Sequence, residues 1–138
     1  MSVSRAGKKA VAERARYCCE YCFSQRKYSP QSFSVEHIAP KSKKGSDEPE
    51  NLALACQGCN GFKYDKTQAI DPLSRRKVAL YNPRKDVWDK HFAWSEDYTE
   101  IIGLSAKGRA TVELLKLNRE EVVNLRKLLI FFGEHPPK

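Results

Sequence analysis

Three side chains in the first half of the chain, Glu36, His37 and Asn60, are suited to hydrolytic chemistry. An imidazole accepts a proton near neutral pH, because its unperturbed pKa is about 6.5. The oxygen atoms of Glu36 and Asn60 suit a hard cation such as Mg²⁺ or Mn²⁺. Hydrolysis of a phosphodiester needs an activated water, a neutralised phosphate and a stabilised leaving oxygen, and a base beside a cation supplies all three.

Two C-x-x-C pairs, Cys19/Cys22 and Cys56/Cys59, enclose most of this region and are separated by 33 residues. Two such turns complete a closed shell of four thiolates around zinc. The separation is longer than the usual ribbon spacing, and an inserted hairpin would account for it. Because the shell leaves no open position, we expect a structural zinc. Cys18 is interpreted as a packing cysteine or a spare thiol.

The elements that must position these groups follow from short patterns. Residues 33–38 alternate apolar and polar, and residues 52–56 form a short apolar run that can pair back with them. The patterns further predict a basic helix over 4–17, a helix from near 59 or 60 that ends before 71, a hairpin of 91–94 with 99–102, a helix over about 106–117 capped by Ser105, and a last helix behind a capping box at 118–121. One domain is expected over 1–138, with a core at about 16–70 and peripheral elements at about 71–138.

The net charge of +8 is concentrated near the N-terminus. Residues 1–44 hold ten Lys/Arg against three Asp/Glu, whereas the remainder holds fifteen against fourteen. This pattern favours a polyanion such as DNA as partner, with RNA as an alternative. Lys41, Lys43 and Lys44 follow His37, and Lys63 lies one turn after Asn60, so these four are expected to contact phosphates. No stretch has the length or the apolar character of a membrane span or a signal peptide, which predicts a cytoplasmic protein.

The combined pattern C-x-x-C, E-H-I-x-P-K-S and E-N-L-A-L-A-C-x-x-C-N-x-x-K resembles the HNH endonuclease family over roughly residues 16–66. Residues 81–94 and 108–118 also resemble a bacterial subgroup. The resemblance implies an α+β fold with a ββα-metal core, to which this chain adds an N-terminal helix and a C-terminal hairpin and helices. It places His37, Asn51 and Asn60 at the three signature positions, with asparagine in the third.

The resemblance also implies a mechanism. His37 is the general base, Glu36 and Asn60 hold a Mg²⁺ or Mn²⁺ ion that stabilises the leaving 3′-oxygen, and Asn51 braces the loop. Lys63 joins the catalytic group through the phosphate or transition state. DNA would be left with 5′-phosphate and 3′-hydroxyl ends. One such site cuts one strand at a time, so either a monomer or a homodimer is compatible with the sequence.

Two other interpretations stay open at this point. The chain could be a zinc module that binds nucleic acid without cutting it, or a redox or zinc-storage protein. A base beside oxygen ligands favours the enzyme over both, since neither alternative needs that combination.

Overall fold

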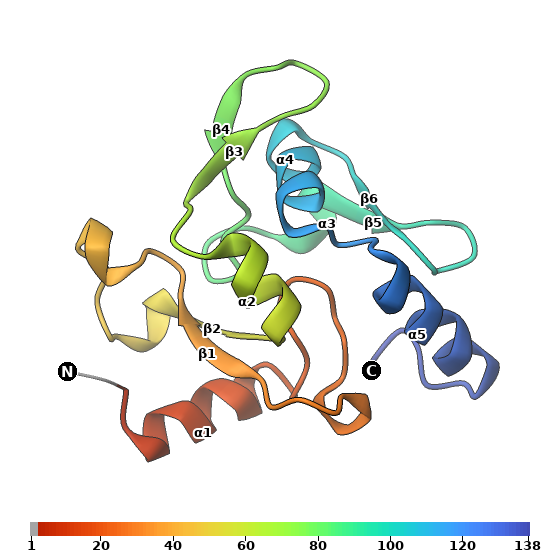
Figure 1. Ribbon diagram of the computed structural model, residues 1–138, viewed down its shortest axis with the longest axis horizontal. Coiled ribbons are helices and arrows are strands. Elements are labelled where there is room, and N and C mark those ends of the chain that lie inside the picture. The colour runs from red at the N-terminus through yellow and green to blue at the C-terminus, as the bar shows by residue number, and fades with distance from the viewer. Residues whose placement is uncertain (1–2) are drawn as a thin grey trace. The chain divides into compact units, whose positions relative to one another are not determined.

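The structure is a computed structural model and describes residues 3–138. It is a mixed α/β chain with short antiparallel strand pairs (Figure 1) and two compact units, Met1–Thr67 and Gln68–Lys138. The first unit contains α1 (Arg5–Arg14), β1 (Ser34–His37), β2 (Leu52–Ala55) and α2 (Gln57–Lys63), with 3-10 turns at Arg26–Tyr28, Lys41–Lys43 and Pro49–Asn51. None of the helices in the described residues is long and apolar enough to cross a bilayer.

The predicted pairing of the two short apolar segments is confirmed. β1 and β2 are antiparallel, with Val35 opposite Leu54 and His37 opposite Leu52. Directly opposed residues share a face of a hairpin, and neighbours along a strand alternate. Val35 and His37 therefore belong to one face of the hairpin, and Glu36 belongs to the other.

Helix α1 covers the face that carries Leu52 and Leu54. Val11 and Ala12 of the helix form a buried cluster with these two leucines. The helix begins after Ser4, whose hydroxyl accepts a hydrogen bond from the backbone N–H of Gly7 at 3.0 Å. It ends at Arg14 because Arg16 and Tyr17 adopt positive φ, so it is shorter than predicted.

Helix α2 contacts β1 and begins earlier than predicted. Its first residue is Gln57, because the Sγ of Cys56 caps the helix by accepting from the N–H of Cys59 at 3.4 Å. The chain leaves the helix after Lys63, where Tyr64 has φ 49°. The predicted continuation to just before residue 71 is wrong, because residues 68–70 form a strand.

The second unit contains β3 (Gln68–Ile70), β4 (Lys77–Ala79), α3 (Trp88–His91), β5 (Phe92–Trp94), β6 (Ile101–Gly103), α4 (Ala106–Leu115) and α5 (Glu120–Phe131). Strands β5 and β6 form the predicted hairpin, and Ser105 caps α4 by accepting from the N–H of Gly108. The hairpin of β3 and β4 was not predicted. Arg109 donates to both carboxylate oxygens of the buried Asp71 at the end of this hairpin.

The capping box predicted before the last helix is wrong. The N-cap of α5 is Arg119, which makes no side-chain cap hydrogen bond. Asn118 instead accepts from the N–H of Ile101 at 2.7 Å and donates to its carbonyl at 2.9 Å. Its side chain therefore pairs with strand β6 in the manner of a neighbouring strand.

Candidate active site and metal centre

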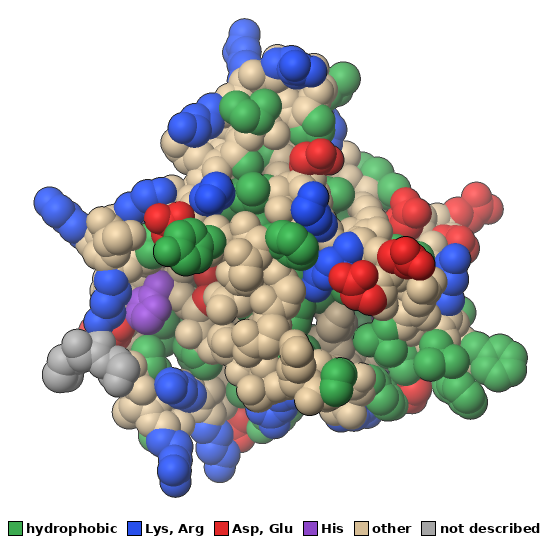
Figure 2. All heavy atoms as spheres, in the orientation of Figure 1, with side chains coloured by type: hydrophobic (Ala, Val, Ile, Leu, Met, Phe, Trp, Pro, Cys, Tyr) green, Lys and Arg blue, Asp and Glu red, His purple; other side chains and the backbone are tan. Residues whose placement is uncertain are grey.

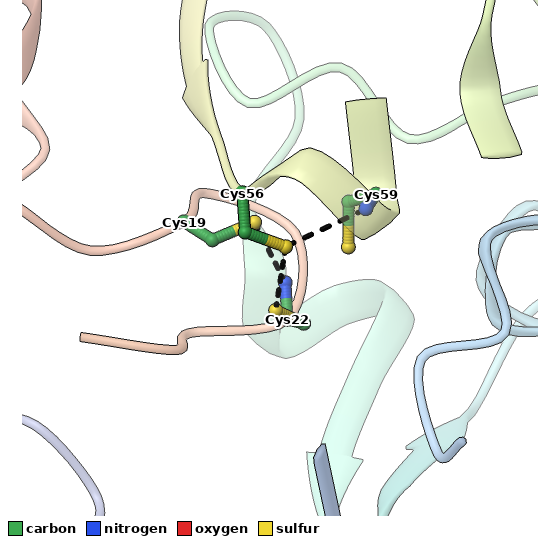
Figure 3. A group of neighbouring side chains, drawn as sticks. All are labelled: Cys19, Cys22, Cys56 and Cys59. Atoms are coloured by element: carbon green, nitrogen blue, oxygen red, sulfur yellow. Dashed lines mark hydrogen bonds between the residues drawn. The ribbon is translucent and has the colours of Figure 1, made fainter. Parts of the chain in front are cut away.

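Four thiol groups converge in the first unit, as predicted from the cysteine spacing (Figure 3). Their Sγ atoms all lie within 4.8 Å of one another, and those of Cys22 and Cys56 are 3.6 Å apart. A zinc tetrahedron with Zn–S near ~2.3 Å has an edge of roughly 3.8 Å. The cluster joins the turn after α1 to the start of α2, and its members are Cys19, Cys22, Cys56 and Cys59.

The surroundings of these thiols also suit a metal. All four side chains are buried, and all are free rather than disulfide-bonded. The N–H groups of Tyr21 and Cys22 donate to Cys19 Sγ at 3.4 Å, whereas burial raises the pKa of the Cys19 thiol well above its usual value. Hydrogen bonds with neighbouring thiols, first that of Cys19, lower the pKa of Cys22 well below its usual value. Four thiolates form a closed shell, so the site fits a structural zinc ion rather than a catalytic one.

Cys18 stands apart from this cluster. Its thiol is buried and lies 3.4 Å from the carbonyl oxygen of Arg16. Burial raises the pKa of Cys18, which keeps the thiol protonated and inert. The fifth cysteine therefore packs locally.

Glu36 lies on the face of β1 opposite to His37, and 6% of its surface is exposed. One carboxylate oxygen accepts from the hydroxyl of Tyr21 at 2.5 Å, and the other accepts from the ammonium of Lys63 at 3.0 Å. Burial raises the pKa of Glu36, and the charge of Lys63 and the hydroxyl of Tyr21 partly oppose this rise. A carboxylate oxygen has two lone pairs, so each still has acceptor capacity.

Lys63 does not lie where a phosphate contact requires. It is 1% exposed, and its ammonium also donates to the carbonyl of Ile38 at 2.9 Å. The sequence predicted a phosphate contact for Lys63, because Lys63 follows Asn60 by about one turn on the same helix face. The helix instead turns Lys63 towards β1, where it neutralises the buried carboxylate of Glu36.

His37 is the last residue of β1 and enters a different hydrogen-bond network. Its Nε2 lies 2.7 Å from one carboxylate oxygen of Asp47, and Lys41 donates to the other at 2.8 Å. These hydrogen bonds, first that from Lys41, lower the pKa of Asp47. An ionised carboxylate only accepts hydrogen bonds, so the proton of a neutral His37 resides on Nε2. Its Nδ1 is then free to accept a proton.

Asn51 ties the two ends of the loop that follows His37. Its Oδ1 accepts from the N–H of Ala39 at 2.9 Å. Its Nδ2 donates to the carbonyl of Ala39 at 3.0 Å and to that of Ser46 at 2.8 Å. These contacts are internal to the loop that carries Lys41 and Asp47.

Asn60 lies within α2, three residues before Lys63, and is half-buried. Over residues 3–138 its side-chain amide has no hydrogen-bond partner, and no hydrogen bond joins it to His37. Lys43 and Lys44 are exposed beside the 3-10 turn after β1, where phosphates have access.

Of the predicted site residues, Glu36 is therefore bonded to Lys63, whereas His37 and Lys41 both contact Asp47. Sequence reasoning missed two partners, Asp47 and Tyr21. Asp47 lies in a polar loop close to Glu48 and Glu50, and nothing in its spacing distinguishes it from them. Tyr21 lies inside the first C-x-x-C pair, and that position is the one signal that it lies near the metal cluster.

The first unit therefore combines a buried four-thiol cluster with a contact between His37, at the end of β1, and Asp47 in the following loop. Residues 19–66 match the model of the HNH endonuclease family, about a third of the chain. The matched segment extends from the first cysteine of the cluster to just beyond α2, so this part of the chain is similar to the HNH family, whose proteins are in general nucleases. Comparisons with curated proteins and with solved structures gave no significant match.

Proposed function

We propose that this protein is a metal-dependent endonuclease that hydrolyses phosphodiester bonds of DNA and leaves 5′-phosphate and 3′-hydroxyl ends. In this proposal β1, β2 and α2 form a ββα-metal core, and the zinc cluster fixes the hairpin to the helix. The HNH match over residues 19–66 supports the class of activity. The geometry around His37 supports the chemistry.

The observation that carries the proposal is the contact between His37 Nε2 and Asp47 at 2.7 Å. A general base needs a defined tautomer with its acceptor nitrogen free, and a carboxylate at the other nitrogen provides this. Asp47 is the positioning residue in this arrangement. His37 Nδ1 takes the proton of the attacking water.

The resemblance assigns the divalent cation, Mg²⁺ or Mn²⁺, to Glu36 and Asn60. The Glu36 carboxylate is buried, bonded to Lys63 and on the face of β1 opposite to His37, so the structure supports Asn60 better than Glu36 as a ligand. A carboxylate and an amide oxygen are hard ligands that suit such ions, and the Asn60 amide is not engaged elsewhere in the described chain. When bound, the cation neutralises charge on the phosphate and on the leaving oxygen. Lys63 holds the Glu36 carboxylate in place beside it and supplies part of the compensating charge.

The remaining predicted residues act on the loop and the substrate. Asn51 holds the loop that carries Asp47, and so acts on His37 indirectly. Lys43 and Lys44 contact phosphates beside the cut. Lys41 donates to Asp47 and, being exposed, also contacts the substrate. Such contacts carry no sequence information, so the expected specificity is low.

Plasmid nicking tests the proposal. The wild-type protein should convert supercoiled plasmid to the open circle with Mg²⁺ or Mn²⁺, and His37→Ala should abolish this while retaining zinc content and circular dichroism. His135→Ala is a matched control, because it removes an imidazole of the second unit and should leave nicking unchanged. A wild-type protein that binds plasmid but does not cut it with Mg²⁺, Mn²⁺, Co²⁺ or Ni²⁺ would instead be a non-catalytic zinc module.

A further inference from the structure

An open groove of about 600 Å³ lies between α1 and the hairpin in the first unit, apart from the zinc cluster and from Glu36. Its floor is apolar and includes Ala12, Val35 and Leu54. Its remaining lining residues come from α1, the turn after it, the first 3-10 turn and the start of β1, and they are Arg5, Lys8, Lys9, Tyr17, Arg26, Phe33 and Ser34.

The charge of this groove has one sign. Four of its lining side chains are cationic and none is acidic, and all four cations are exposed. In the described part of the chain, Arg5, Lys8 and Lys9 take part in no ion pair. Blue side chains gather over α1 at the lower left of Figure 2. Cations without acidic partners beside a concave surface are suited to a phosphate backbone.

The groove also presents aromatic surface. Tyr17 is 38% exposed, and the guanidinium of Arg26 lies 4.5 Å from the centre of its ring. Phe33 is half-buried on the same lining. Cationic walls with accessible ring faces are the combination by which proteins hold single strands, because any base can stack on an aromatic ring or a guanidinium.

The groove leads towards His37 along β1. Val35 lines it, and His37 follows two residues later on the same face of the strand, roughly 7 Å further on. The groove and the imidazole are therefore neighbours on one face of β1. Because the groove lies close to His37, a nucleic acid bound in it can be the same molecule that is cut.

We propose that this groove binds an unpaired single-stranded segment of the substrate that flanks the bond to be cut. The proposal rests on the nuclease function proposed above and adds to it a preference for DNA with a single-stranded region. Arg5, Lys8 and Lys9 contact its phosphates, and Tyr17 with Arg26 stacks against a base.

Binding of a fluorescein-labelled oligo(dT) of 15 nucleotides, followed by fluorescence anisotropy without divalent cations, tests the proposal. The triple variant Arg5→Gln/Lys8→Gln/Lys9→Gln should lose about two units of the slope of log K against log salt, since each single-strand phosphate contact contributes about 0.7. The control removes three exposed cations of the second unit and should change the slope little. It is Lys90→Gln/Lys127→Gln/Lys138→Gln.

Tyr17→Ala tests the stacking part. It should weaken oligo(dT) binding at least about five-fold, with Tyr17→Phe close to wild type, and it should weaken binding of a 15-base-pair duplex much less. Equal losses in the two triple variants, an unchanged slope in the groove variant, or an equal effect of Tyr17→Ala on duplex and single strand would each overturn the proposal.

Plasmid nicking is measured separately on the same proteins. If the wild type never cuts but the groove variants lose oligo(dT) binding, the groove stands and the nuclease proposal fails. If the wild type cuts and the groove variants bind as it does, the nuclease proposal stands and the groove fails. Zinc content of every variant confirms that the first unit is folded.

Discussion

The Lys63→Met variant tests the buried ion pair with Glu36. The two side chains are 2% and 4% exposed, and the ammonium lies 3.0 Å from the carboxylate. Methionine keeps most of the length of the lysine side chain but leaves the carboxylate without its counter-charge. Loss of one partner of a buried pair costs about 3–5 kcal/mol, and we expect the free energy of unfolding of the first unit to fall by that amount at pH 7.

The assay must report on the first unit alone. Both tryptophans, Trp88 and Trp94, lie in the second unit, so their fluorescence follows that unit. Release of zinc to a chromophoric chelator during a urea titration follows the first. The double variant Glu36→Gln/Lys63→Met is the control, and it should recover much of the loss because no unpaired charge is then buried.

The pH dependence has a defined sign. The folded-state pKa of Glu36 is raised above its ordinary value of 4.5, so the folded protein holds this proton more tightly than the unfolded chain. The associated stability is present below pH 4.5 and is lost as the pH rises through the folded-state pKa. Lys63→Met removes a charge that lowers this pKa, so its deficit against wild type should be smaller at pH 5 than at pH 7. A deficit under about 1 kcal/mol at pH 7, or one independent of pH, would refute the reasoning.

Three further predictions concern the metal centre, the base and the cation. Cys56→Ser should lose zinc and unfold the first unit, since structural zinc contributes about 10–16 kcal/mol, whereas Cys18→Ser should keep both; equal thermal melts of these two variants would remove zinc from the account. Asp47→Asn should slow nicking at least roughly 10-fold, because His37 loses the carboxylate that fixes its tautomer; unchanged nicking would exclude this positioning role. Asn60→Ala should keep its fold by circular dichroism and raise the Mg²⁺ concentration for half-maximal nicking at least roughly 10-fold, and unchanged Mg²⁺ dependence would reassign the ligand.

The parts of the fold that sequence predicted are those with strong local patterns. The alternation at 33–38 and the apolar run at 52–56 predicted β1 and β2, and Ser105 predicted the start of α4. The hairpin of β3 and β4 has strands of three residues in which only the middle residue is partly buried, and such strands are too short to give a recognisable sequence pattern. Asn118 fitted a capping box by spacing, but the partner that it bonds, Ile101, lies 17 residues away, which no local pattern contains.

In the candidate site, spacing predicted the metal cluster but not the hydrogen-bond partners. Two C-x-x-C pairs fix the thiols because each turn is short and stiff. The partners of Glu36 and His37 come from elsewhere in the chain, Tyr21 and Asp47, through a loop and a turn whose conformations depend on tertiary packing. Lys63 is a second example. Its spacing from Asn60 predicted a shared helix face but not whether that face meets solvent or the buried carboxylate of Glu36.

The loop after His37 connects Asn51 to Asp47, the hydrogen-bond partner of His37. Gly45 lies so close to the carbonyl of Ala39 that an added Cβ would stand 1.7 Å from its oxygen and 2.9 Å from Asn51 Nδ2. Only glycine therefore permits the close approach by which Asn51 bonds both ends of the loop. Asp47 directly follows Ser46, whose carbonyl Asn51 holds, so the carboxylate on His37 is positioned by an amide that never contacts the imidazole. We therefore propose that Asn51 acts on the orientation of His37, whereas Asn60 would hold the cation.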